Sequence, residues 1–289
     1  MQKLNRFIAY LQLARLHQRV GIYLLFLPCL CAILLAMKLM PEVHLHEILR
    51  VTFLFFVGAV FMRSAGCVVN DLIDVNFDRQ VARTKNRPLA LGIISKKAAL
   101  IFLSILLGFA LLILLQFNKN TIFGGFFILN FVLFYPLMKR ITFFPQIFLG
   151  ITFNFGIVMA SLSLLNHISN AHLILYAAFI ILTLLYDTIY AFQDIEDDLK
   201  IGVKSSAIAF SKNPKLILNF LNALILILLI YLGFKEQFDR GFFVIIFAIF
   251  LIAFFQIIFT DFKNSQNCLN LFKQAVFFEI FIAIAILIG

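Results

Sequence analysis

Blocks of about twenty consecutive apolar residues recur along the whole chain, and they constrain its fold more than any other feature. Of its 289 residues, 63% are hydrophobic and 13% are charged, whereas a soluble domain is nearer half apolar and a quarter charged. A helix of about twenty residues crosses the roughly 30 Å hydrocarbon layer of a bilayer. The sequence therefore predicts an all-α, polytopic membrane protein with about nine transmembrane helices.

The positions of the lysines and arginines predict which loops lie on the cytoplasmic side of the membrane. The nine expected spans are 20–40, 48–69, 98–116, 121–138, 143–165, 171–193, 214–233, 241–260 and 270–288. The basic stretch before the first span lacks the features of a signal peptide, so we interpret it as a cytoplasmic lead-in. Most of the 24 lysines and arginines then lie on the cytoplasmic side, as the positive-inside rule requires. The same rule explains the net charge of +10, and no nucleic-acid partner is expected.

Acidic residues are concentrated in two stretches at the cytoplasmic end. More than half of the 14 acidic residues lie in "NDLIDVNFD" (70–78) and "DTIYAFQDIEDD" (187–198). Each stretch follows an apolar helix and precedes a basic loop. We interpret this echo as one transmembrane domain, 1–289, with two pseudo-repeated halves, roughly 1–140 and 141–289. Both acidic ends are expected to converge on one central cavity, with the active site at the cytoplasmic end.

The spacing within each stretch predicts a ladder of oxygen ligands. If the second span continues as a helix, residues four apart lie on one face; in the first stretch these are Asn70, Asp74 and Asp78, and in the second Tyr186, Tyr190, Asp194 and Asp198. Stacked carboxylates are costly at membrane depth unless a cation compensates them. Oxygen ligands favour Mg²⁺, which leaves positions open for substrate phosphates. The two ladders thus predict a diphosphate held through Mg²⁺ between two helices.

Basic residues follow both ladders, and guanidinium and ammonium groups suit phosphate oxygens. They are Arg79, Arg83, Arg87, Lys139, Arg140, Lys200 and Lys204. Each alone is also expected from topology, but together with the acids they favour a phosphate site. Arg63 lies inside the second span, about two turns before Asn70, and is expected to point into the same cavity.

Other roles for the acidic residues would require other features in the sequence. Helix caps rarely need three oxygens on one face. A transporter or channel requires ionisable groups along a transmembrane path, and apart from Asp187 and Arg63 the predicted spans are almost bare of them. A purely structural membrane protein does not account for two spaced ladders. An enzyme is therefore favoured.

Both acidic stretches, with their surroundings, resemble the signatures of UbiA-type membrane prenyltransferases. "NDLIDVNFD" followed by "RTKNRPL" (83–89) resembles the first signature, and "YDTIYAFQDIEDDLKIGVKS" (186–205) resembles the second. The second is closest to the 4-hydroxybenzoate polyprenyltransferases of ubiquinone biosynthesis. "YPLMKRITFFPQIFLG" (135–150) and "HQRVGIYLLFLP" (17–28) are also similar to that subfamily. The resemblance covers nearly the whole chain.

The resemblance implies nine helices around a central cavity, dependence on Mg²⁺, and a polyprenyl diphosphate donor. The implied reaction transfers the polyprenyl group to the ring carbon ortho to the hydroxyl of 4-hydroxybenzoate. Another aromatic acceptor, a menaquinone precursor or haem, is the alternative within the family. The implied location is the bacterial inner membrane, in contact with membrane lipid, with the amino terminus and active site on the cytoplasmic side. No obligate protein partner is evident.

The resemblance also implies roles for particular residues. The metal ligands are expected to be Asn70, Asp74, Asp194 and Asp198, supported by Asp78. We expect catalysis to depend on Asp74, Asp78, Asp194, Asp198 and Arg140. We expect the diphosphate to be bound by Arg79, Arg83, Arg87, Tyr135, Lys139, Lys200 and Lys204, and the cavity to be lined by Arg63, Tyr186 and Tyr190. Many relatives carry Arg where this chain has Val75, so Arg79 or Arg63 is expected to replace it.

Overall fold

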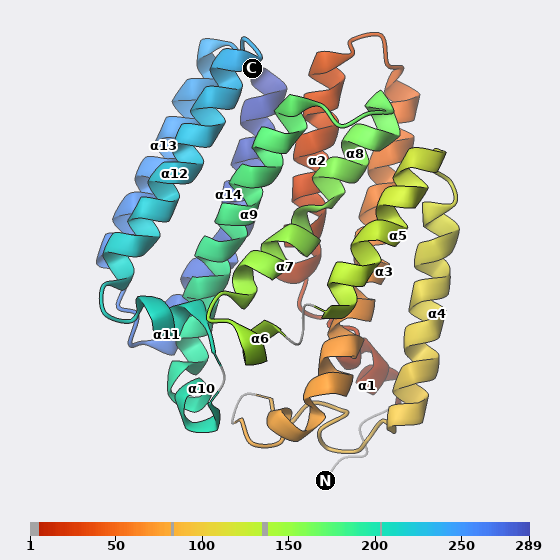
Figure 1. Ribbon diagram of the computed structural model, residues 1–289, viewed down its shortest axis with the longest axis vertical. Coiled ribbons are helices and arrows are strands. Elements are labelled where there is room, and N and C mark those ends of the chain that lie inside the picture. Colours follow the sequence, from red (N-terminus) through yellow and green to blue (C-terminus); the bar gives the residue numbers. More distant parts are fainter. Residues whose placement is uncertain (1–5, 82–83, 135–137, 203) are drawn as a thin grey trace.

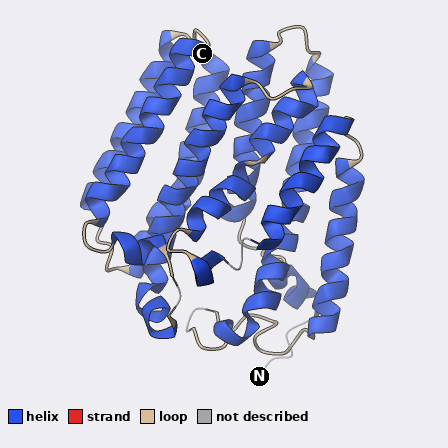
Figure 2. Ribbon diagram, viewed as in Figure 1, coloured by secondary structure: helices blue, strands red, loops and turns tan. Residues whose placement is uncertain are grey.

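The structure is a computed structural model that describes residues 6–81, 84–134, 138–202 and 204–289, and for residues 133, 139, 140, 197 and 201 it describes the backbone only. Every regular element in these ranges is a helix (Figure 1; Figure 2). They are α1 (Arg6–Leu13), α2 (Val20–Leu39), α3 (Leu45–Asp78), α4 (Lys96–Leu114), α5 (Lys119–Phe134), α6 (Met138–Ile141), α7 (Pro145–Asn154), α8 (Gly156–Leu165), α9 (Asn170–Ala191), the 3₁₀ turn η2 (Phe192–Asp194), α10 (Ile195–Ile201), α11 (Ser206–Phe210), α12 (Pro214–Lys235), α13 (Arg240–Phe259) and α14 (Ser265–Ile288).

Eight candidate membrane spans are found in the described part of the chain, with α7 and α8 together forming one of them. The remaining predicted span corresponds to α5, which has 16 residues and ends at Phe134. Helix α1 and the carboxyl terminus lie at opposite ends of the bundle (Figure 1), as an odd number of crossings requires. The predicted all-α, polytopic membrane fold is confirmed, with a count of about nine.

The span predicted at 143–165 is broken at Phe155, between α7 and α8. The Asn154 amide donates to Thr183 Oγ1 on α9 at 2.8 Å. The Tyr176 hydroxyl donates to the Ile151 carbonyl at 2.7 Å, which an unbroken helix would bond to the amide of residue 155. Side chains of α9 and α7 thereby supply the polar partners that a break at membrane depth requires.

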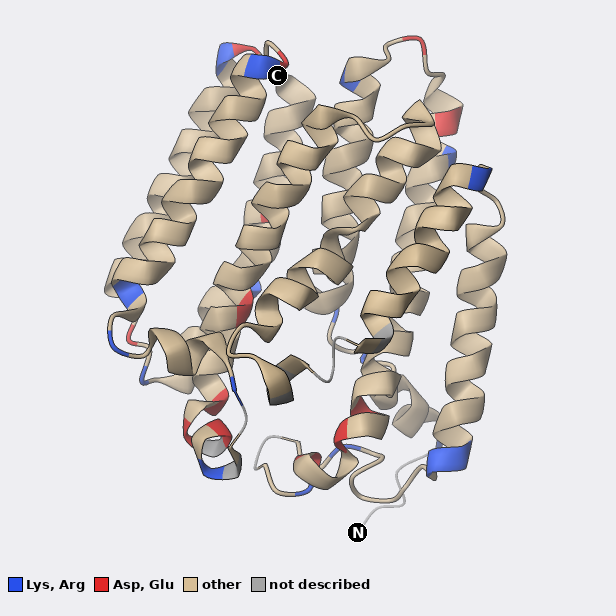
Figure 3. Cartoon of the chain, in the orientation of Figure 1, with Lys and Arg blue, Asp and Glu red and all other residues tan. Residues whose placement is uncertain are grey.

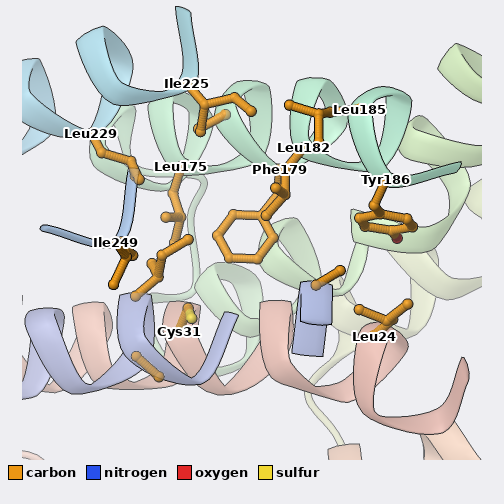
Figure 4. Close-up of a cluster of buried hydrophobic side chains, with 14 of the residues drawn as sticks. Leu24, Cys31, Leu175, Phe179, Leu182, Leu185, Tyr186, Ile225, Leu229 and Ile249 are labelled. Carbon is orange, nitrogen blue, oxygen red and sulfur yellow. The ribbon is translucent and has the colours of Figure 1, made fainter. Parts of the chain in front are cut away.

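Two apolar clusters hold the bundle together. The larger one packs α9 against α2, α12 and α14, and it packs α13 against α12 and α14. Figure 4 shows Leu175 and Phe179 of α9 gathered with Ile225 of α12 and Cys31 of α2. The smaller cluster joins α1, α3, α4 and the loop between α3 and α4; it contains Ala9, Leu13, Ala65, Val68, Val75, Leu89, Ile94, Ala99 and Leu106.

Helix α7 approaches α9 closely at Gly150, where a Cβ atom would lie 2.9 Å from the Ile180 carbonyl oxygen. Because that oxygen belongs to helix backbone, Gly150→Ala is expected to push the helices apart and destabilise the protein by about 1–3 kcal/mol. Gly108→Ala is the control, since Gly108 has no neighbour within 4 Å; it is expected to be neutral or up to about 1 kcal/mol stabilising. Thermal unfolding in detergent compares the two, and equal midpoints would contradict the close packing.

Candidate active site

A cavity of about 1430 Å³ lies within the bundle. Its apolar wall comes from α2, α3, α4, α5, α7, α8 and α14, while its polar side chains come mainly from segment 12–19 and the last turns of α3. Most small-molecule pockets are smaller, about 300–1,000 Å³. The volume of the cavity and the residues that line it thus suit a large ligand with one polar end and one apolar end.

The first acidic stretch is helical throughout, because α3 continues to Asp78. Asn70 and Asp74, one turn apart, line the cavity. Asp78, the third residue of the ladder, is not among the lining residues; it accepts a hydrogen bond from Arg87 at 2.8 Å. The structure therefore presents two of the three predicted oxygen donors to the cavity.

Asp71, which follows Asn70, is buried at the centre of a charge network. Its Oδ1 lies 2.8 Å from Arg15 Nη2 and 3.0 Å from Arg87 Nη1. Burial lowers the pKa of the Arg15 guanidinium from its ordinary value, and the Asp71 carboxylate opposes this effect; an arginine nevertheless stays charged in proteins. The network fastens both the amino-terminal segment and the loop after α3 to the end of α3.

The second acidic stretch does not form one continuous helix. Helix α9 ends at Ala191, and η2 and α10 follow. Tyr186 and Tyr190 line the cavity, whereas Asp194 and Asp198 are not among its lining residues. The expectation that all four share one helical face is wrong, because the tighter 3₁₀ turn changes the rotation per residue. Figure 3 shows acidic residues on α10 and near the end of α3, both at the lower end of the bundle.

Two predicted diphosphate ligands make other contacts. Arg79 Nε donates to the Ala90 carbonyl at 3.0 Å, which closes the loop after α3. Lys204 Nζ donates to the Ile141 carbonyl at 3.2 Å and lies 5.3 Å from the centroid of the Phe143 ring. Neither residue lines the cavity. Among the predicted diphosphate ligands with described side chains, Arg87 alone does so.

The other predicted basic residues are less informative. Lys200 is exposed on α10. Arg83 and Tyr135 lie outside the described residues, and for Lys139 and Arg140 only the helical backbone of α6 is described. Over the described residues no group of three or more His, Cys, Asp or Glu side chains is placed to hold a metal ion. The assignment of Asn70, Asp74, Asp78, Asp194 and Asp198 as metal ligands stays a prediction.

Arg63 and Asp187, which both lie inside predicted spans, also line the cavity. Arg63 on α3 lies with its guanidinium carbon 5.5 Å from the centroid of the Phe153 ring. Asp187 lies on the wall formed by α9. Charged groups at such positions are costly and generally functional.

The sequence profile of the UbiA prenyltransferase family matches residues 25–283, which is most of the chain. This chain belongs to the UbiA prenyltransferase family.

Several relatives in this family match over most of their length. A protein of Blochmanniella pennsylvanica named 4-hydroxybenzoate octaprenyltransferase is 37% identical, with 94% of this chain and 89% of the relative covered. A protein of Francisella tularensis subsp. novicida with the same name is 40% identical, with 92% and 91% covered.

Solved UbiA homologues share the fold. The apo structure from Aeropyrum pernix K1 has a TM-score of 0.70 and 21% identity, covering 93% of this chain and 96% of that chain. A structure from Archaeoglobus fulgidus bound to GPP and Mg²⁺ has a TM-score of 0.68 and 22% identity, covering 96% and 99%.

Sequence reasoning placed several cavity residues of this UbiA protein outside the site. They are Arg15, Arg19, Asp71, Asn86, Asp187 and Lys273. Asp187 could have been identified as a site residue from the sequence, because it is an ionisable residue inside a predicted span. Val75, where the resemblance implies an Arg, is buried in the smaller apolar cluster. Of its two expected substitutes, Arg63 lines the cavity and Arg79 does not.

Proposed function

We propose that this UbiA-family protein transfers a polyprenyl group from a polyprenyl diphosphate to the ring carbon ortho to the hydroxyl of 4-hydroxybenzoate, in ubiquinone biosynthesis. The observation that carries this proposal is 37–40% identity, over nearly the whole chain, to proteins named 4-hydroxybenzoate octaprenyltransferase. The cavity supports it, because a polar end and a long apolar wall match a diphosphate joined to a hydrocarbon chain.

The donor's diphosphate is placed at the polar end of the cavity, with Mg²⁺. Asn70 and Asp74 offer the amide and carboxylate oxygens that Mg²⁺ prefers, and this ion needs few protein ligands when phosphates complete its shell. Asp194 and Asp198 on the α10 side would supply the second set of oxygens, with Asp78 in support. When bound, Mg²⁺ neutralises the charge that develops on the departing diphosphate.

The remaining chemistry falls to the chain's own side chains. As the carbon–oxygen bond to diphosphate breaks, the allylic carbon becomes cationic. The Tyr190 and Phe272 rings, with centroids 4.6 Å apart on the cavity wall, can stabilise that charge with their faces. The ring carbon of the acceptor then forms the new bond, and a carboxylate or diphosphate oxygen takes its proton. The apolar walls keep water from the cation.

The protein is an integral membrane protein. We assign it to the bacterial inner membrane, with segment 12–19 and the acidic stretches at the cytoplasmic face, because the basic residues follow the positive-inside rule in that orientation. The proposed halves, 1–140 and 141–289, each place an acidic stretch at the lower end of the bundle (Figure 3).

Prenyl transfer in membranes that contain the protein tests this function. A polyprenyl diphosphate and radiolabelled 4-hydroxybenzoate are supplied with Mg²⁺ or with EDTA. Label is expected in the lipid extract with Mg²⁺ and at background with EDTA, and re-added Mg²⁺ is expected to restore it. Absence of transfer by well-inserted protein would overturn the assignment of 4-hydroxybenzoate; a menaquinone precursor or haem would then be supplied in the same assay.

A further inference from the structure

Helix α1 is short and has two unlike faces. Ala9 and Leu13 are fully buried in the smaller apolar cluster, where they pack with residues of α3 and α4. On the opposite face Phe7 is 66% exposed and Ile8 is 43% exposed, and both follow the exposed Arg6. Exposed apolar side chains beside a basic residue are typical of a helix that lies at the boundary between lipid headgroups and acyl chains.

The contacts of α1 place it across α3 and α4 near the lower end of the bundle (Figure 1). The rings of Tyr10 and Phe102 pack with their centroids 5.0 Å apart. Phe102 follows Lys96, the first residue of α4, by six residues, which is about 9 Å along the helix axis. An interfacial helix buries its apolar face to a depth of about 5–10 Å. Helix α1 therefore lies at a suitable depth when Lys96 is among the headgroups.

Basic side chains lie beside the exposed face of α1. Lys96 and Lys97 are exposed at the start of α4, and Figure 3 shows basic residues at that end of the helix. The next two residues, Ala98 and Ala99, pack in the same apolar cluster as α1. We call Arg6, Phe7, Ile8, Lys96 and Lys97 the α1 surface. None of its five residues lines the cavity.

The three cations of the α1 surface have no carboxylate partner among the described residues. The nearest acidic residues on α3, Asp71 and Asp78, are already paired with Arg15 and Arg87. The positive-inside rule accounts for basic residues at this end of the chain, but it does not require an amphipathic helix beside them. Basic groups at headgroup depth, next to apolar side chains, match the phosphate and acyl chains of an anionic lipid.

We propose that the α1 surface binds anionic phospholipids in the leaflet next to the polar end of the cavity. Arg15, two residues after the end of α1, pairs with Asp71, and both line that end of the cavity. Lipid bound to the α1 surface therefore holds in place a segment that forms part of the candidate active site. This lipid site is separate from the proposed donor and acceptor sites, and it does not depend on the proposed reaction.

The chain contains no tryptophan, so Phe7→Trp introduces a single fluorescent reporter into the α1 surface. The variant is reconstituted into vesicles of phosphatidylcholine with phosphatidylglycerol, in which one lipid or the other carries brominated acyl chains that quench a neighbouring indole. A basic residue near a membrane contributes about 1 kcal/mol, or roughly a fivefold preference for the anionic lipid, so phosphatidylglycerol at about 20% of the lipid should give roughly half of the quenching.

Phe247→Trp is the control for reporter position, because Phe247 is 57% exposed within α13, away from the α1 surface. Quenching there should follow the bulk share of each lipid. Ile8→Trp provides a second reporter in the α1 surface if Phe7→Trp does not fold. The vesicles contain phosphatidylglycerol in both leaflets, so the result does not depend on the orientation of the protein.

The charge is tested by replacing Arg6, Lys96 and Lys97 together with Gln in the Phe7→Trp protein, which should reduce quenching by phosphatidylglycerol to its bulk share. The matched control replaces three exposed basic residues elsewhere, Lys212, Lys235 and Arg240, and should keep the enrichment. Bulk-share quenching in Phe7→Trp, equal enrichment in Phe247→Trp, or enrichment that survives the loss of Arg6, Lys96 and Lys97 would each overturn the inference. None of these results bears on the proposed function, which the prenyl-transfer assay tests.

Discussion

Asp74→Ala is expected to reduce prenyl transfer by about 100- to 1,000-fold or more while leaving an inserted, folded protein. Asp74 lines the cavity beside Asn70, on the helix turn proposed to hold the metal-bound diphosphate. Its carboxylate would act on charge that develops during bond breaking, and removal of one such stabilising group commonly has an effect of this size. Initial rates at saturating donor and acceptor measure the change.

Asp261→Ala is the matched control, since Asp261 is an exposed aspartate in the loop before α14. It should keep the wild-type rate and the wild-type elution volume in detergent. Substantial turnover by Asp74→Ala would contradict the proposal that the first acidic stretch holds the metal.

The same measurement on Asp194→Ala tests the other half of the site. Asp194 does not line the cavity in this structure. A loss as large as that of Asp74→Ala would mean that η2 and α10 turn toward the cavity when donor and metal are bound. A near-normal rate would leave the first stretch as the principal metal site.

Asp71→Asn is expected to lower stability by about 3–5 kcal/mol, because it removes one partner from a buried ion-pair network. Arg15 and Arg87 both bind the same oxygen of Asp71, and Arg15 has no other described carboxylate partner. Loss of this contact should release the amino-terminal segment from α3 and lower activity as well. Thermal unfolding in detergent measures the stability.

The control for this prediction is Glu47→Gln, which breaks the partly exposed pair with Arg50. A surface pair contributes about 0–1 kcal/mol, so its unfolding midpoint should scarcely move. The double variant Arg15→Met, Asp71→Asn should be more stable than Asp71→Asn alone, since it no longer buries an unpaired guanidinium. Equal midpoints for wild type and Asp71→Asn would contradict the network.

The sequence was sufficient to predict those features that depend only on residues close together in the chain. Apolar blocks of span length specify membrane helices whatever their neighbours, and a spacing of seven residues placed Arg63 on nearly the same face as Asn70. The break at Phe155 was not predicted, because its polar partners come from Thr183 and Tyr176 on another helix.

The charge network was missed for a related reason. Asp71 lies about 100° around the helix from Asn70, so the one-face argument excluded it from the site. Its partners Arg15 and Arg87 are remote in sequence; Arg15 was explained by topology alone, and Arg87 was assigned to the diphosphate. Similarly, four-residue spacing could not reveal that α9 gives way to a 3₁₀ turn before Asp194.

The length of α3 has a consequence for where the proposed product goes. At 34 residues it is about 50 Å long, more than the roughly 30 Å of hydrocarbon. Its last turns can therefore meet a water-soluble acid at the aqueous boundary while its middle faces the lipid tail of the donor. Once the two are joined, the aromatic ring carries a hydrocarbon anchor and cannot return to water at any useful rate. Later enzymes that modify this ring would have to collect it from the bilayer.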